Sequence, residues 1–238
     1  MLRFLRCAAV FGGLILSASA LAVDVDPTSY GFPLTNPFEA TIATTPADLR
    51  PDLPADADID QADYTLNLRP ERDFTLPDNF WAVKKLRYRL AKQNHPAPLV
   101  FLIAGTGAPY TSTLNEFLKK LYYGAGYNVV QLSSPSSFDF MSAASRFATP
   151  GVSKDDAEDL YRVMQAVRAQ QSNVQITDYY LTGYSLGALD AAFVAHLDET
   201  RRSFNFKRVL LLNPPVNLYT SITNLDKLVQ TEVKGINN

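Results

Sequence analysis

The stretch from residue 179 to residue 196 decides the fold of this chain: Tyr-Tyr-Leu-Thr-Gly-Tyr-Ser-Leu-Gly-Ala-Leu-Asp-Ala-Ala-Phe-Val-Ala-His. It reads as a short apolar strand, the pentad Gly183-Tyr184-Ser185-Leu186-Gly187, and an Ala-rich helix that no Pro or further Gly interrupts. A serine on so sharp a turn is expected in a strained backbone conformation, and its flanking glycines are needed because a β-carbon there would collide with the neighbouring strand and helix. The hydroxyl then stands clear of the fold at a helix N-terminus, whose free N–H groups can stabilise a negatively charged oxygen. The alternative is a tight turn in which the serine only caps the helix.

The N-terminus has the pattern of a secretory signal peptide. Arg3 and Arg6 make the start basic, residues 7–16 form an apolar run, and the small residues at 18–22 supply a cleavage site. We expect a mature chain that begins at Leu21 or Val23 and is periplasmic or secreted, most simply in a bacterial periplasm. The alternative is a retained N-terminal anchor helix. Cleavage would remove Cys7, the only cysteine, and with it any disulfide or thiol chemistry.

Composition excludes several classes of function. The formal net charge is −2 and no basic patch is interleaved with aromatic residues, so nucleic acid is a poor partner. After the leader no segment is long and apolar enough to span a bilayer. The acidic run at residues 52–63 lacks the Gly turn and terminal Glu of a calcium loop and reads as a solvated surface. We therefore expect neither a metal nor a cofactor.

The order of patterns along the chain predicts a domain with an α/β fold. Residues 23–62, rich in Pro, Asp, Ala and Thr, read as an irregular N-terminal arm, and residues 63–238 as the domain itself. Strands are expected near 64–68, 81–91, 98–104, 127–132, 179–183 and 208–212, the last four parallel. A helix is expected over 113–123, with Leu114, Phe117, Leu118 and Leu121 on its apolar face, and another opens at Ser153 after a long loop at 133–151. Antiparallel strands followed by βαβαβ predict a mostly parallel sheet with helices on both faces.

Taken together, residues 99–212 resemble the α/β-hydrolase family, over roughly half of the chain. The resemblance makes the pentad that family's nucleophile elbow and the strands at 98–104, 127–132, 179–182 and 208–212 its third to sixth. It implies a serine esterase or lipase-like enzyme without a cofactor, in which Ser185 is the nucleophile. The turn at residues 104–107 stands where the family supplies one oxyanion-hole N–H, so by this match the N–H groups of Thr106 and Leu186 would hold the oxyanion. Ala104 replaces the usual histidine of that turn, but a backbone donor needs no particular side chain. The alternative is a Gly-rich turn with no role.

The resemblance stops short of a catalytic triad. The family places its acid and histidine after the seventh and eighth strands, which this sequence does not show. His95 precedes the third strand, at the end of the sheet opposite the elbow. His196 lies eleven residues beyond Ser185 on the same helix, about 16 Å along the axis at ~1.5 Å per residue, whereas a general base must lie within about 3 Å.

Three explanations remain open for the absent histidine. The first, which we favour, is that the sequence is an N-terminal portion of a longer protein. The second is a relative that binds a ligand without catalysis, and the third is a chain whose site a partner completes. Asp226 is the carboxylate soon after the last strand that could serve as the acid, and Asp190 more simply stabilises the end of the elbow helix.

A further candidate lies after the strand at 127–132. Its serines and aromatic residues could line an acyl pocket, although an ordinary folded loop is the stronger reading. The residues are Ser133, Ser134, Ser136, Ser137, Phe138, Phe140, Met141 and Phe147.

The function predicted is an exported serine hydrolase that acts on a small-molecule acyl or ester substrate, with lipid among the candidates. The alternative is a non-catalytic α/β-hydrolase-like binding protein of the cell envelope.

Overall fold

The structure, a computed structural model, describes residues 50–68 and 84–232, together with the single positions 34, 36, 39, 75 and 78. The chain divides into two units, Met1–Arg50 and Pro51–Asn238. The fold set out here is that of the second unit. The expected signal peptide at residues 1–22 and most of the expected arm before residue 50 lie outside the described residues.

Within the described residues, six strands form one mixed sheet in the order β1-β2-β4-β3-β5-β6. The strands are β1 (Gln61–Leu66), β2 (Leu86–Ala91), β3 (Ala97–Ile103), β4 (Asn128–Leu132), β5 (Ile176–Tyr184) and β6 (Arg208–Leu212). β2 runs antiparallel to both β1 and β4, whereas β3 pairs in parallel with β4 and β5, and β5 with β6. The predicted architecture is confirmed, including the parallel pairing of β3 with β4.

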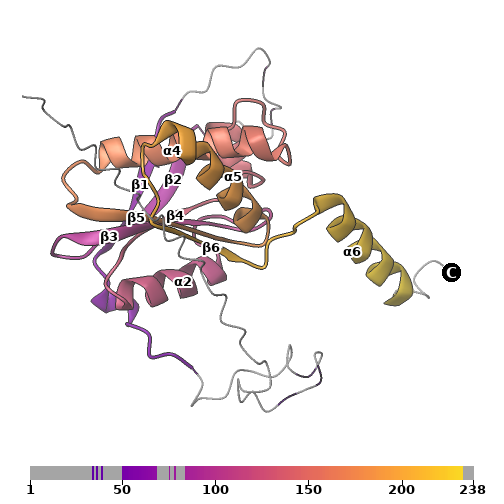
Figure 1. The fold of residues 1–238 in the computed structure, drawn as a ribbon, viewed down its shortest axis with the longest axis horizontal. Helices are drawn as coiled ribbons and strands as arrows, with labels where there is room; N and C mark the ends of the chain where they lie inside the picture. Colours follow the sequence, from indigo (N-terminus) through magenta and orange to yellow (C-terminus); the bar gives the residue numbers. More distant parts are fainter. Residues whose placement is uncertain are drawn as a thin grey trace, which may run out of the picture. The chain divides into compact units, whose positions relative to one another are not determined.

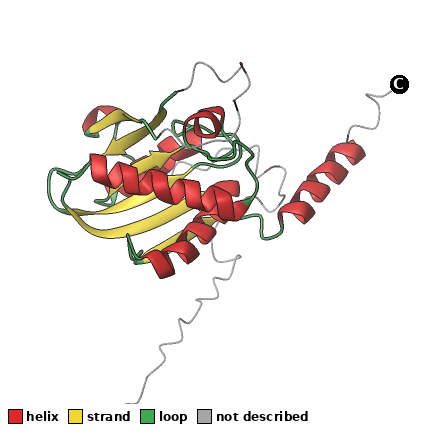
Figure 2. Ribbon diagram, turned by 90° about the horizontal axis from the view of Figure 1, so that it is seen from above, coloured by secondary structure: helices red, strands yellow, loops and turns green. Residues whose placement is uncertain are grey.

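Helices lie on both faces of this sheet. They are α2 (Thr113–Gly124), α3 (Phe138–Ala143), α4 (Ser153–Gln170) and α5 (Leu186–Arg201). A further helix, α6 (Leu218–Glu232), follows β6, and a 3-10 turn, η3 (Asp56–Asp58), precedes β1. Figure 1 shows α2 on one face and α4 and α5 on the other, and Figure 2 shows helices of this group lying over the strands. This is the arrangement that alternating parallel strands and helices require.

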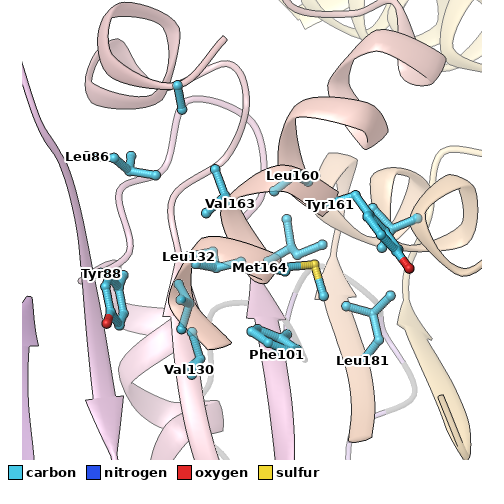
Figure 3. Packing of buried hydrophobic residues seen from close by; sticks show 14 of the residues in the cluster. Leu86, Tyr88, Phe101, Val130, Leu132, Leu160, Tyr161, Val163, Met164 and Leu181 are labelled. Atoms are coloured by element: carbon cyan, nitrogen blue, oxygen red, sulfur yellow. The ribbon is translucent and has the colours of Figure 1, made fainter. Parts of the chain in front are cut away.

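The two faces of the sheet carry separate apolar cores. Toward α4 and α5, Phe101 and Leu181 from the strands pack with Leu160 and Met164 of α4, and all four are almost completely buried (Figure 3). Burial of a side chain of this size stabilises the fold by about 1.5–3 kcal/mol. A smaller cluster lies on the α2 side of the sheet and contains Val100, Leu102 and Leu118. Leu102 is the residue that follows Phe101 in β3. Successive residues of β3 thus serve opposite cores, as the period of a strand requires.

The central strand β4 is buried along its whole length although it contains two amides. Asn128 donates from Nδ2 to the carbonyl of Ala97 at 3.1 Å, and Gln131 donates from Nε2 to the carbonyl of Tyr110 at 3.0 Å. Because buried polar groups are costly unless they are bonded, these contacts lower the cost of both residues, while the Oε1 of Gln131 has no hydrogen-bond partner among the described residues.

Several boundaries differ from those predicted. β1 begins at Gln61, inside the expected arm, and β5 begins at Ile176. β2 begins at Leu86, while residues 81–83 of the strand expected there lie outside the described residues. The interval expected as a loop at 133–151 contains α3. α4 begins at Ser153, as expected, and its N-cap is Val152, whose carbonyl accepts hydrogen bonds from the N–H groups of Asp155 and Asp156.

The buried face of α2 was also predicted in part incorrectly. Leu118 is buried, but Leu114 and Phe117 are 41% and 39% exposed, whereas Lys119 is completely buried. Lys119 is accommodated because its ammonium donates to Glu116 at 2.5 Å and to the amide oxygen of Gln61 at 2.7 Å. Polar partners from β1 and from the same helix therefore rotate the helix away from its simple apolar stripe.

The acidic run before and within β1 is not merely a solvated surface, as the composition suggested. Asp63 lies 2.7 Å from the Arg89 guanidinium, and Asp56 lies 3.1 Å from the Lys120 ammonium. Burial raises the pKa of the Asp63 carboxyl, but hydrogen bonds from Arg89 and Tyr110 outweigh it, so the net pKa is lowered. The run joins the start of the domain to β2 and α2. Among the described residues, no group of three or more His, Cys, Asp or Glu side chains could hold a metal ion.

Candidate active site

Ser185 occupies the turn between β5 and α5 in the strained conformation that the pentad predicts. Its φ is 53° and its ψ is −127°, a combination that residues with a side chain rarely adopt. The surroundings hold it there: its N–H donates to the carbonyl of Leu212 in β6 at 2.9 Å, and its carbonyl accepts from the N–H of Ala188 at 3.0 Å. The residue is exposed, so the turn presents the hydroxyl to solvent.

The two glycines of the pentad are required by close contacts with backbone. A β-carbon on Gly183 would lie 2.1 Å from the carbonyl oxygen of Gly187. One on Gly187 would lie 2.3 Å from the carbonyl oxygen of Ala104 and 2.5 Å from that of Ile103. These oxygens belong to backbone and cannot move aside like the end of a side chain. The reason given for the glycines from sequence is confirmed.

The N-terminus of α5 directly follows the serine. Leu186 is the first residue of this helix, so its N–H has no partner within the helix. The first turn carries no acidic side chain that would compete for this end of the helix dipole. An anionic oxygen beside Ser185 would therefore meet a free donor and a favourable dipole.

The turn at residues 104–107 lies against the elbow. A β-carbon on Gly105 would come within 2.7 Å of the Tyr184 ring and 3.2 Å of the Ser185 β-carbon. Thr106, the next residue, is exposed, and within the described part of the chain its N–H makes no hydrogen bond. The structure thus brings the three predicted site residues, Ser185, Thr106 and Leu186, to one edge of the sheet; their catalytic roles remain predictions.

Neither histidine lies near this edge. His95 is an exposed residue in the connection between β2 and β3, where its Nδ1 lies 3.0 Å from the carbonyl oxygen of Pro96. The side chain of His196 is 81% exposed on α5 and its Nδ1 lies 3.0 Å from the carboxylate of Glu199. These positions agree with the expectation that neither side chain activates Ser185.

The two candidate carboxylates lie in very different environments. Asp226 is exposed on α6. Asp190 is completely buried on α5, and neither of its carboxylate oxygens has a hydrogen-bond partner among the described residues, so the expectation that it stabilises the helix end was wrong. Burial, with a smaller contribution from the nearby Asp156, raises the pKa of the Asp190 carboxyl to about 8. Asp190 is therefore mostly protonated at neutral pH and is no acid partner of a triad.

The serine-rich segment after β4 is a folded connection rather than the lining of an acyl pocket. Ser133, Ser134 and Ser137 are buried, and Phe140 belongs to the core on the α4 side of the sheet. Phe138 is 68% exposed. Of the two interpretations offered from the sequence, the ordinary folded loop is the one that agrees with these positions.

Sequence reasoning did not find a role for Tyr184, the variable residue before the serine. Its hydroxyl shares a 2.9 Å hydrogen bond with the hydroxyl of Ser112, which also accepts the N–H of Asn115 at the start of α2. The Tyr184 ring covers Gly105. Only the tertiary structure reveals that Tyr184 links the elbow to the start of α2, because nothing in the sequence around Tyr184 points to that helix.

A groove of about 550 Å³ lies between α4 and α5. Its lining includes Arg146, Glu158, Phe193 and Arg201. Glu158 and Arg201 are paired with each other at 2.6 Å across the groove.

Among the described residues no helix is long and apolar enough to cross a membrane.

Comparison with known proteins gives a match at the level of structure alone. No family profile matches the sequence, and no curated protein matches it. An esterase from Pyrococcus furiosus is similar with a TM-score of 0.53 at 15% identity, over 74% of this chain and 57% of that one. Brefeldin A esterase, described as a bacterial homologue of human hormone sensitive lipase, has a TM-score of 0.49 at 16% identity, over 81% of this chain and 51% of that one.

The chain therefore spans little more than half the length of these two structures. At 15% identity the similarity to the Pyrococcus esterase is one of fold. This chain's own features are the strand order, the parallel strands β3 to β6 and the strained turn between β5 and α5. This chain has the α/β-hydrolase fold.

Proposed function

We propose that the protein is an exported serine hydrolase that cleaves an ester or another acyl bond through an acyl-enzyme on Ser185. The observation that carries the proposal is the backbone of Ser185, with its φ of 53° between two glycines that cannot carry a β-carbon. Such strain persists where the surrounding structure must present one side chain in one direction. A serine that only capped a helix would not require it.

In the proposed reaction, the Ser185 hydroxyl oxygen attacks the carbonyl carbon of the substrate. A C–O bond forms, the carbonyl π electrons move to the substrate oxygen, and the hydroxyl proton passes to a base. The N–H groups of Thr106 and Leu186 stabilise the resulting oxyanion. Collapse of this intermediate breaks the bond to the leaving alcohol, which takes up a proton, and water then hydrolyses the acyl-enzyme by the same route.

The base must come from outside the two histidines of this chain. His196 is paired with Glu199 on the solvent side of α5, and His95 follows β2 at the other end of the sheet. We propose that a histidine and a carboxylate beyond residues 1–238, or on a partner chain, complete the triad. Without a base a serine hydroxyl is a weak nucleophile, and oxyanion donors alone leave a residual acceleration on the order of 10³-fold over water.

The substrate class proposed is a small-molecule ester, with lipid esters among the candidates. Support comes from the Pyrococcus structure, which is described as an esterase, and from the chemistry of an exposed serine beside two free backbone donors. The side chains around the elbow, Tyr184 and Leu186, do not select one acyl group.

A second candidate is a non-catalytic binding protein of the cell envelope with this fold. The position of both histidines away from Ser185 favours it. The two candidates differ in one property: only the hydrolase turns over an ester.

The test is ester hydrolysis by the natural full-length protein, measured with p-nitrophenyl esters that carry short and medium acyl chains. We expect turnover that Ser185→Ala abolishes and that His196→Ala leaves unchanged, since the His196 side chain is exposed and its ring nitrogen pairs with Glu199 on the same helix. Absence of turnover with every ester would favour the binding protein. A large loss in His196→Ala would show that the argument against this histidine is wrong.

We also propose that the protein is exported to the periplasm or secreted, on the basic start and small-residue cleavage site of residues 1–22. N-terminal sequencing of the protein from the cell envelope should find Leu21 or Val23 first. Recovery of the protein with Met1 retained would contradict cleavage.

A further inference from the structure

Three segments meet at the edge of the sheet where Ser185 lies. β3 and β4 are parallel neighbours, with Ile103 opposite Leu132, so the turn after Ile103 and the serine-rich segment after Leu132 emerge side by side. β5 lies on the other side of β3 and leads into the elbow. The serine-rich segment is thus separated from Ser185 by the turn that carries Thr106.

The serine-rich segment holds this turn through three hydrogen bonds. The N–H of Gly107 donates to the hydroxyl of Ser136 at 2.8 Å, and the N–H of Tyr110 donates to the hydroxyl of Ser133 at 2.9 Å. In the opposite direction, the N–H of Ser134 donates to the carbonyl of Ala108 at 3.0 Å. The first contact is made by the residue immediately after Thr106.

The hydroxyls that accept these bonds are themselves fixed. Ser136 shares a 2.8 Å hydrogen bond with the hydroxyl of Ser134, which is completely buried. Ser133 donates at 2.7 Å to the carboxylate of Asp139, which also accepts from Ser137. Each of the two accepting hydroxyls, Ser136 and Ser133, therefore has a second partner within the serine-rich segment besides the N–H of the turn that it binds.

Among residues 106–110 of the turn, these contacts leave only the N–H of Thr106 without a hydrogen-bond partner in the described part of the chain. Gly107, Ala108 and Tyr110 each donate to a partner, and Pro109 has no N–H. Within the described residues, Thr106 N–H makes no hydrogen bond and lies beside the elbow. A free donor held between bonded neighbours is preorganised, which is the property that an oxyanion hole requires.

We propose that Ser136, supported by Ser134, is a positioning residue that fixes the Thr106 N–H for the oxyanion. The inference rests on the proposed function for its catalytic meaning. Ser136 does not touch the substrate in this account; it acts through the peptide unit between Thr106 and Gly107. Loss of one oxyanion donor costs about 10²–10³ in rate, so a donor that is present but loosened should cost less, on the order of tenfold.

The experiment uses the natural full-length protein with three variants: Ser136→Ala, Ser136→Thr, which keeps the hydroxyl, and Ser142→Ala as the matched control. Ser142 is a buried serine of the same segment, but its hydroxyl donates to the carbonyl of Phe138 within α3. Two quantities are measured. They are the second-order rate constant for fluorophosphonate labelling of Ser185, and amide hydrogen exchange of a peptide that covers residues 104–110.

We expect Ser136→Ala to label about ten times more slowly and to exchange faster over residues 104–110. Ser136→Thr should restore the labelling rate and the hydrogen exchange to the wild-type values. Ser142→Ala should change neither of them, even if it lowers the thermal stability as much as Ser136→Ala does. Wild-type labelling and exchange in Ser136→Ala, or equal losses in Ser142→Ala, would overturn the proposal. If wild-type protein does not label at all, the proposed hydrolase function fails, and exchange over residues 104–110 decides the anchoring role alone.

Discussion

At the scale of single residues, the glycines around Ser185 show how steric exclusion sets a site. Gly187 lies so close to the backbone oxygens of Ala104 and Ile103 that no β-carbon fits between them. This contact seats the start of α5 directly on the end of β3. The same contact brings the turn at 104–107 next to Ser185.

Replacement of Gly187 by Ala should therefore separate α5 from β3. We expect a loss of about 3 kcal/mol or more in the free energy of unfolding, since the obstacle is backbone and cannot repack. Gly126→Ala is the control, because Gly126 has a positive φ but a β-carbon there would have no neighbour within 4 Å. It should lose only the about 1–2 kcal/mol of left-handed strain. Equal losses in urea titrations of the two variants would contradict this account.

The buried carboxyl of Asp190 leads to a prediction about how the free energy of unfolding depends on pH. Its folded pKa of about 8 lies above the ordinary value of 3.8, because the carboxyl is buried and lies near Asp156 of α4. The folded state then binds the proton more tightly than the unfolded state, so stability falls as pH rises between about 4 and 8. The slope from this one group is at most about 1.4 kcal/mol per pH unit.

Asp190→Asn keeps the shape of the protonated carboxyl and removes its titration. Urea titrations from pH 5 to 8 should show a stability that falls with pH in the wild type and is flatter in the variant. The carboxyl of Asp156, whose pKa burial raises to about 6, contributes in the same direction in both proteins. Parallel profiles for the two proteins would show that Asp190 ionises normally in the folded state.

At the scale of elements, α2 is held by charge as well as by apolar packing. The Lys119 ammonium is completely buried against Glu116, and Glu116 also accepts from Arg89 of β2 at 2.8 Å. Arg89 in turn contacts Asp63 of β1. This chain of ion pairs connects α2 to the two antiparallel strands.

Glu116 has two cationic partners, Lys119 and Arg89, whereas Lys119 has only one close anionic partner among the described residues, so the two substitutions should differ in cost. Glu116→Gln leaves the Lys119 ammonium buried with only the more distant, exposed Asp56 as an anionic partner among the described residues, at 3.7 Å, and should cost about 3 kcal/mol. Lys119→Met removes the buried charge, while Glu116 keeps Arg89, and should cost less than about 1 kcal/mol. Chemical denaturation of both variants checks the order. A greater loss in Lys119→Met than in Glu116→Gln would contradict it.

Elements whose pattern is local were the ones that the sequence predicted well. The apolar run of β3 and the pentad around Ser185 carry their own signals, and both lie at the predicted positions or very close to them. The orientation of α2 was not predictable, because the buried Lys119 needs partners from β1 and η3, far away in sequence, in addition to Glu116 of its own helix. For the same reason the anchoring contact of Ser136 with Gly107 could not be seen, although Ser136 itself was a candidate.

At the scale of the whole described domain, apolar side chains remain exposed on β6 and α6. Leu210 is 51% exposed on β6, and Ile222, Leu225 and Leu228 are at least half exposed on α6. Among the described strands, none pairs with the outer edge of β6. An unpaired edge with exposed apolar side chains favours association.

Residues 23–238 expressed alone should therefore self-associate in a concentration-dependent way. Analytical ultracentrifugation should show oligomers that a double substitution, Leu210→Lys with Leu225→Lys, shifts toward the monomer. Lys154→Glu, on α4, is the control and should leave the distribution unchanged. A monomer at all concentrations would contradict the prediction.

The central claim, that the strained turn presents Ser185 as a nucleophile beside two backbone donors, is tested most directly by fluorophosphonate labelling with peptide mapping. In the natural full-length protein we expect the label on Ser185 and none in Ser185→Ala. Residues 23–238 alone should label slowly or not at all, since neither His95 nor His196 can act as its base. Fast labelling of residues 23–238 would show that a base lies within them, and a full-length protein that never labels at Ser185 would contradict the claim itself.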